Sequence, residues 1–231
     1  MLSIVDLIEA ETFAPDLAAY ALAAISRGAS FLVGALPGGA GKTTVMGALL
    51  NFVPADIELA PADGLATIRS GAAAPHPRRC YICHEIGRGS YYAYLWGEAL
   101  RAYFDLPAAG HMIATNLHAD TFEQAREQIR ADNGVAESAF GRMNLMFFLS
   151  VTRRGFGTRR RIEAVWESDG TGPHRQVYSA GSPGAVESSL VAPDDVAAAR
   201  KRLDRLLADG ARTIEQVRSA LYADGPAEGR P

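Results

Sequence analysis

Lysine is almost absent from this chain of 231 residues, because Lys42 and Lys201 are the only two and arginine supplies the rest of the positive charge. Neither sign of charge dominates, since the formal net charge is −3. The chain as a whole therefore has no electrostatic attraction to nucleic acid or to anionic membranes, and any such contact must be local.

Long apolar runs are missing as well. No stretch approaches the roughly 18 residues that a membrane span needs. Acidic residues follow Met1 within a few positions, which does not suit a targeting segment. We therefore expect a soluble intracellular protein with no transmembrane segment, and the length suits one sizeable domain with a small appendage.

Cysteine is scarce too, since the chain contains only Cys80 and Cys83. Both lie in a short apolar string that we interpret as a strand. A separation of three residues along a strand points two side chains to opposite faces, which suits neither a shared metal ion nor a disulfide. Two buried strand residues are thus favoured over zinc or redox chemistry, and a metal site with His84 and His118 is disfavoured.

What the sequence does contain is a glycine-rich segment, 36–44, between the apolar run 31–33 and a predicted helix. Glycines there let backbone N–H groups turn inward around phosphate oxygens, and the helix N-terminus adds partial positive charge. We therefore predict a P-loop for a nucleoside triphosphate, with Lys42 on the β- and γ-phosphates and Thr43 on Mg²⁺. A compact ammonium suits such a cradle better than a guanidinium. One departure is Leu36, which stands where the pattern has glycine. The predicted nucleotide-binding residues are Pro37, Gly38, Gly39, Ala40, Gly41, Lys42, Thr43 and Thr44.

Strand-like and helix-like segments alternate along the chain. The predicted strands are 31–34, a short stretch around 57–59, 80–84, 112–114, 143–152, 160–167 and 176–178. The predicted helices are 15–27, 43–52, 91–104, 122–132, 193–207 and 213–222. This order predicts an α/β fold with a mostly parallel sheet, helices on both faces and an antiparallel hairpin at one edge. Ligands bind at the carboxyl ends of such strands, where the P-loop, Glu85 and His118 each follow an apolar strand.

Four segments, in this order, resemble the ATPases of type II and type IV secretion systems, type IV pili and archaeal flagella. The segments are the strand and P-loop 31–44, the strand 80–85 ending in Glu85, the segment 110–120 with its Gly-His and Leu-His pairs, and the strand and basic hairpin 143–165. The second is similar to the family's Walker B strand and the third to its histidine box. Together the resemblance spans roughly residues 5–180.

The resemblance implies a RecA-like motor core that binds ATP and Mg²⁺ and hydrolyses ATP. It implies a homo-oligomer, a hexameric ring in this family, that works with a membrane platform or other secretion-machine proteins. The protein would then be cytoplasmic, with peripheral contact at the inner face of the cell membrane, and nucleic acid is not expected as a direct ligand. Glu85 is predicted to hold Mg²⁺ or polarise the attacking water, and His118 to sense the γ-phosphate. Glu58 is the first candidate for the family's acidic box, and Asp63 is the second.

Departures from the family leave alternatives open. Its N-terminal domain is expected to be missing, the stretch 53–79 is shorter, and 84–88 places an arginine one position late. We predict an ATPase core over 1–181, a linker over 182–192, a helical appendage over 193–224 and a disordered tail over 225–231. A truncated nucleotide-binding subunit with little turnover, which partners a larger ATPase, is one alternative. A P-loop small-molecule kinase is another, although 60–79 offers few arginines for its lid.

A cluster of arginines brackets a glycine-containing turn in the predicted basic hairpin. Its members are Arg153, Arg154, Arg159, Arg160 and Arg161. Such a cluster can reach a nucleotide across a subunit boundary or hold an acidic partner. A solvated hairpin is the favoured interpretation.

Overall fold

The computed structural model describes residues 2–89, 91–154, 157–181 and 186–222. Within these residues, an eight-stranded sheet has the order β2-β3-β5-β1-β6-β7-β8, and β4 pairs with β3 outside this path. The strands are β1 (Phe31–Gly34), β2 (Glu58–Pro61), β3 (Arg79–Ile86), β4 (Tyr94–Leu95), β5 (Met112–Leu117), β6 (Leu145–Arg154), β7 (Gly157–Glu167) and β8 (Arg175–Ser179). Among the described strands, β7 pairs in antiparallel fashion with both β6 and β8, and the other pairings are parallel, so the predicted mostly parallel sheet with an antiparallel edge is confirmed.

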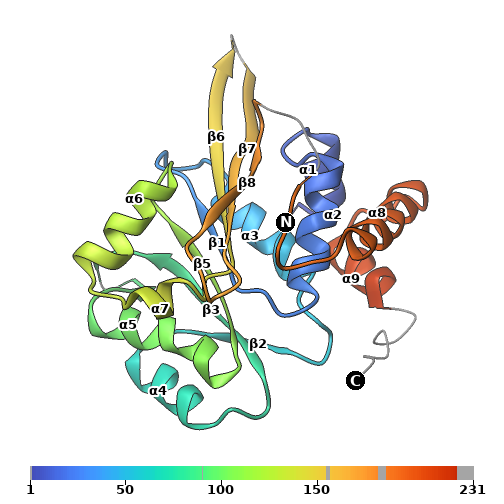
Figure 1. Cartoon of the computed structure of the whole chain (residues 1–231). Helices are drawn as coiled ribbons and strands as arrows, with labels where there is room; N and C mark the ends of the chain where they lie inside the picture. The colour runs from blue at the N-terminus through green and yellow to red at the C-terminus, as the bar shows by residue number, and fades with distance from the viewer. Residues whose placement is uncertain (1, 90, 155–156, 182–185, 223–231) are drawn as a thin grey trace.

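Helices cover both faces of the sheet (Figure 1). One face carries α1 (Ile4–Glu9), α2 (Pro15–Ile25), α3 (Lys42–Leu50), α8 (Pro193–Ala208) and α9 (Ile214–Tyr222). The other carries α4 (Leu65–Ala73), α5 (Glu98–Asp105), the 3₁₀-helix η1 (Leu106–Ala109), α6 (Phe122–Arg126), the π-helical turn η2 (Glu127–Asp132) and α7 (Glu137–Phe140). None of the helices in the described ranges is long and apolar enough to cross a membrane.

Each face has its own hydrophobic cluster. Cys80 packs in the cluster under α2 and α3, whereas Cys83 packs in the cluster under α5, as their separation of three residues predicts. Both thiols are free and buried, and burial raises the pKa of each to about 12. Both cysteines therefore serve as small apolar residues of the sheet.

The two C-terminal helices bury one side against the body of the protein. Leu203 of α8 and Val217 of α9 belong to the same hydrophobic cluster as Phe31 and Val33 of the central strand β1. The helices predicted over 193–207 and 213–222 are thus present, and each buries one stripe of its surface, as an amphipathic surface helix does. The division into core, linker, appendage and tail stays a prediction, and residues 182–185 and 223–231 lie outside the described part.

The structure differs from the prediction in the start of one helix and contains two helices that the sequence did not predict. The helix predicted over 91–104 begins only at Glu98, because Tyr94 and Leu95 pair with the end of β3 instead. A helix, α4, occupies part of 60–77, where few apolar residues gave a periodic signal. A further helix, α1, precedes α2 and begins with a capping box in which Ser3 and Asp6 bond each other's backbone N–H groups.

Candidate functional site

The glycine-rich segment forms a loop between β1 and α3. Gly39 and Gly41 have φ values of +73° and +104°, a backbone conformation that glycine adopts without strain. Gly41 is the N-cap of α3, so the free N–H groups at the start of this helix face the loop. This backbone has the form that the sequence predicts for a phosphate-binding loop.

Lys42 lies buried at the carboxyl edge of the sheet, with an exposed fraction of 7%. Its Nζ lies 3.2 Å from the backbone oxygen of Ala35, 3.3 Å from His118 Nδ1 and 3.8 Å from Glu85 Oε2. Burial lowers the pKa of Lys42, although the negative charges of Glu85 and Asp120 oppose that shift. The ends of the adjacent strands β1, β3 and β5 thus bring together three residues that the sequence predicts as functional.

Glu85 is the carboxylate of this group, and 6% of it is exposed. Its Oε2 faces the two basic residues, 3.8 Å from Lys42 Nζ and 3.7 Å from His118 Nε2. Burial raises the pKa of Glu85, and the positive charges of Lys42, His118 and His84 oppose that shift. The other oxygen, Oε1, is buried without a hydrogen-bond partner among the described residues.

Residues 117–120, which follow or end β5, also contact the start of the P-loop. His118 Nδ1 lies 3.0 Å from the backbone oxygen of Leu36, and the backbone N–H of Leu36 donates to Asp120 Oδ1 at 2.6 Å. The backbone N–H of Ala35 donates to the oxygen of Leu117 at 3.1 Å. Asp120 was missed by sequence reasoning, because nothing in the pattern says which carboxylate meets a backbone group 84 positions away.

An arginine of the basic hairpin binds the P-loop from the other side. Arg160 Nε donates to the backbone oxygen of Ala40 at 3.1 Å, and its Nη2 donates to that of Gly39 at 3.4 Å. The neighbouring arginines pair with carboxylates, Arg159 with Glu11 and Arg161 with Glu163. The side chains of Arg153 and Arg154 lie outside the described part of the structure. Arg160 thus contacts the glycine-rich loop, whereas the sequence favoured a hairpin whose arginines are solvated.

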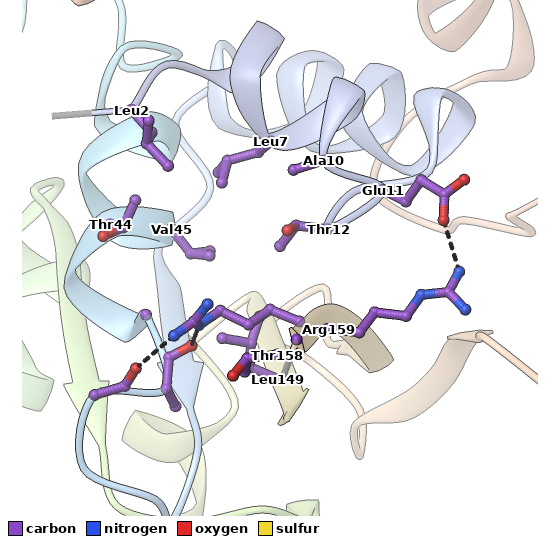
Figure 2. Close-up of a pocket in the computed structure, with 15 residues that line it drawn as sticks. Leu2, Leu7, Ala10, Glu11, Thr12, Thr44, Val45, Leu149, Thr158 and Arg159 are labelled. Carbon is purple, nitrogen blue, oxygen red and sulfur yellow. Dashed lines mark hydrogen bonds and ion pairs between the residues drawn. The ribbon is translucent and has the colours of Figure 1, made fainter. Parts of the chain in front are cut away.

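A pocket of about 510 Å³ opens between α1, the P-loop and the β6–β7 hairpin. Figure 2 shows the apolar side chains of Leu7, Val45 and Leu149 around it, with Thr44 on the P-loop side. The Arg159–Glu11 ion pair, at 2.8 Å, stands at its edge. The pocket therefore adjoins the first turn of α3 and is mostly apolar.

The structure does not bring Glu58 to this group. Glu58 opens β2 and pairs with Arg79 at 2.7 Å, at the amino end of β3. Glu85 follows six residues later on β3, about 20 Å along the strand. Asp63, the second candidate, follows β2 and is exposed near the edge that carries Glu85.

Oxygen donors at the site suit Mg²⁺, which prefers hard oxygen ligands and is held by few protein groups together with phosphates. The exposed Thr43 follows Lys42 in the first turn of α3, and Glu85 offers a carboxylate at the same edge of the sheet. The residues present therefore fit the predicted metal.

The fold of this chain recurs in solved structures. The ATPase DotB of Yersinia pseudotuberculosis matches it with a TM-score of 0.50 and 11% identity, over 96% of this chain and 60% of DotB. The chain has the fold of a DotB ATPase. The resemblance to secretion ATPases that the sequence segments predict is thereby confirmed at the level of the fold.

Two weaker matches are the DotB ATPase of Legionella pneumophila and the VirB11 ATPase of the Brucella suis type IV secretion system in complex with sulphate. The first has a TM-score of 0.44 and 12% identity over 90% of this chain and 59% of DotB. The second has a TM-score of 0.48 and 19% identity over 65% of this chain and 53% of VirB11. This chain therefore spans 53% to 60% of the length of these ATPases. Its sequence matches no protein-family model and no curated protein.

Proposed function

We propose that this protein binds ATP with Mg²⁺ and hydrolyses it as the motor core of a secretion-type ATPase. The observation that carries this proposal is the convergence of Lys42, Glu85 and His118 beside a loop with left-handed glycines. Phosphoryl transfer to water needs charge stabilisation and a positioned nucleophile, and this group offers a cation and a carboxylate for those tasks.

Lys42 is the predicted phosphate ligand. Its Nζ is held by a backbone oxygen and by His118, so these weak contacts give way to the β- and γ-phosphates when nucleotide binds. The negative charge of the phosphates would oppose the lowering of the Lys42 pKa that burial causes. Mg²⁺, when bound by Thr43 and Glu85, would neutralise charge that develops on the phosphate oxygens.

The pocket beside the P-loop is our proposed site for the base and ribose. Its volume of about 510 Å³ lies within the ordinary range of ligand pockets, and its walls offer apolar side chains for the faces of a base. Its position next to Thr44, one residue beyond the predicted metal ligand, lets one nucleotide span both the loop and the pocket.

We further propose a cytoplasmic protein that assembles as a ring, hexameric in the family it resembles, and docks on a membrane platform of a secretion or pilus machine. Its resemblance to that family in four sequence segments and the DotB fold support this. The proposed core is 1–181, with 182–192 as linker, 193–224 as appendage and 225–231 as tail.

One observation favours a second function, a nucleotide-binding subunit with little turnover. The backbone N–H of Leu36 is already bonded to Asp120, and the Leu36 side chain is 46% exposed where the P-loop pattern has glycine. A loop with this start offers one donor fewer to a nucleotide.

Phosphate release with Mg-ATP at several protein concentrations tests the two functions. Turnover that rises with concentration and is lost in both Lys42→Ala and Glu85→Gln supports an assembling motor. Lys201→Ala is the matched control, because it removes the other lysine, which lies exposed on α8. Nucleotide binding that only Lys42→Ala abolishes, without turnover in any variant, supports the binding subunit instead.

A further inference from the structure

Two buried side-chain oxygens lack a hydrogen-bond partner among the described residues, and both lie at the proposed site. They are Glu85 Oε1 and Asn116 Oδ1. Asn116 is fully buried on β5, between β1 and β3, and sequence reasoning assigned it no role. An unpartnered buried acceptor is costly, and native proteins rarely keep one without a functional reason.

The strand register places Asn116 beside the end of β3 that carries Glu85. Asn116 lies where the pairing of β3 with β5 is irregular, between Cys83 and Ile86. Its Nδ2 donates to the backbone oxygen of His84 at 2.9 Å, which is the peptide group that leads into Glu85. This bond uses the NH₂ group of the Asn116 amide, so the oxygen Oδ1 is the atom that has no hydrogen-bond partner among the described residues.

The two oxygens of Glu85 have different surroundings. Oε2 faces the cations Lys42 and His118, at 3.8 Å and 3.7 Å. Oε1 has no hydrogen-bond partner among the described residues and, like Asn116 Oδ1, can only accept a hydrogen bond when the carboxylate is ionised. A water molecule has two O–H donors, which is the number that this pair of acceptors requires.

We propose that Asn116 is a catalytic residue that, with Glu85, orients the attacking water, an inference that rests on the proposed ATP hydrolysis. The water donates one hydrogen to Glu85 Oε1 and the other to Asn116 Oδ1, which turns a lone pair of its oxygen toward the γ-phosphorus. The new P–O bond forms as the bond to the bridging oxygen breaks, and that electron pair leaves with ADP. The proton passes to Glu85 and then to solvent.

The test compares Asn116→Leu with Asn133→Leu. Asn133 is a buried asparagine with both ends satisfied, since its Oδ1 accepts from the N–H of Gly97 at 2.6 Å and its Nδ2 donates to Gln128 at 2.7 Å. For each variant we would measure steady-state phosphate release, the Kd for a fluorescent ATP analogue with Mg²⁺, and the thermal midpoint.

We expect Asn116→Leu to lose at least about tenfold in kcat, with a Kd within about twofold of wild type. Its thermal midpoint should fall less than that of Asn133→Leu, because Asn116→Leu loses one side-chain hydrogen bond, the one to the His84 oxygen, whereas Asn133→Leu loses two. Asn133→Leu should lower the midpoint and leave kcat per folded molecule unchanged. If the leucine variant does not fold, Asn116→Ser preserves space for the water and should still lower kcat at least about threefold.

A folded Asn116 variant with wild-type kcat would overturn the role of Asn116 and leave the proposed hydrolysis standing. A loss of kcat that only parallels a loss of nucleotide affinity would do the same. A wild-type protein that releases no phosphate overturns the proposed hydrolysis, and this inference with it.

Discussion

Glu167 offers the sharpest test of how the fold is held together. It ends β7, its side chain is completely buried, and its carboxylate accepts four close hydrogen bonds. The donors are the hydroxyl of Tyr20 at 2.5 Å, the hydroxyl of Ser188 at 2.5 Å, and the N–H and hydroxyl of Ser189 at 2.7 and 2.8 Å. Arg175 adds a longer contact at 3.3 Å. This one carboxylate therefore joins the sheet to α2 and to the segment before α8.

Replacement of Glu167 with Gln should lower the free energy of unfolding by about 2–6 kcal/mol. An amide has one accepting oxygen and its NH₂ group faces donors, so about two of the four donors lose their acceptor at about 1–3 kcal/mol each. That loss is a large part of the roughly 5–15 kcal/mol by which a domain is stable. Urea unfolding followed by circular dichroism measures it.

The matched control is Glu163→Gln on the same strand. Glu163 pairs with Arg161 and its side chain is 42% exposed, so the expected loss is below about 1 kcal/mol. A loss below about 1 kcal/mol for Glu167→Gln would refute the reasoning, because it would mean that the four donors find other partners at no cost.

The pH dependence of stability gives an independent check. Burial alone would raise the pKa of Glu167, but the hydrogen bonds from Ser188, Tyr20 and Ser189 outweigh it and hold the pKa below its ordinary value of 4.5. The stability that Glu167 contributes is therefore fully present above pH 4.5 and is lost as the pH falls through the lower pKa of the folded state. Between these limits the unfolding free energy of wild type should fall more steeply than that of Glu167→Gln.

Three further predictions concern the glycine-rich loop and the two buried cysteines. Asp120→Asn keeps an acceptor for the N–H of Leu36 and removes a negative charge near the proposed phosphate site. Mg-ATP should therefore bind about three- to tenfold more tightly at low salt. Equal or weaker binding in a fluorescence titration would contradict this prediction. Arg160→Ala should weaken the same binding by about five- to tenfold through loss of its charged hydrogen bonds to the P-loop, whereas Arg161→Ala should not. Both buried cysteines, with pKa values of about 12, should resist a thiol reagent at pH 8 until the protein unfolds, and labelling of the native protein would argue against their burial.

The strand ends of the site could be predicted from the sequence because local patterns carry them. A glycine-rich segment after an apolar run predicts the loop, and apolar runs that end in Glu85 or His118 predict that both lie at one edge of the sheet. The structure does place these residues together with Lys42. Their catalytic roles stay predictions.

The contacts around the loop could not be predicted, because they join residues far apart in the chain. Leu36 and Asp120 are 84 positions apart, and Arg160 lies 120 positions from Ala40. No periodicity encodes such a pair. Glu58 does not reach the site for a different reason. It is the first residue of β2, which runs parallel to β3, so it lies beside Arg79 at the amino end of β3.

The β6–β7 ribbon continues past the strands that flank it, and Figure 1 shows it projecting from the sheet. β1 pairs with β6 only over Leu145–Phe148, while β6 and β7 remain paired as far as Arg154 and Gly157. Arg160 lies in this free part and bonds two carbonyls of the P-loop. The free part of the ribbon is thus connected to the glycine-rich loop through the side chain of Arg160. A force that bends the ribbon must stretch these hydrogen bonds or move the loop. Bending of the ribbon and binding of a ligand at the loop would therefore act on the same peptide groups, and each would change the free energy of the other.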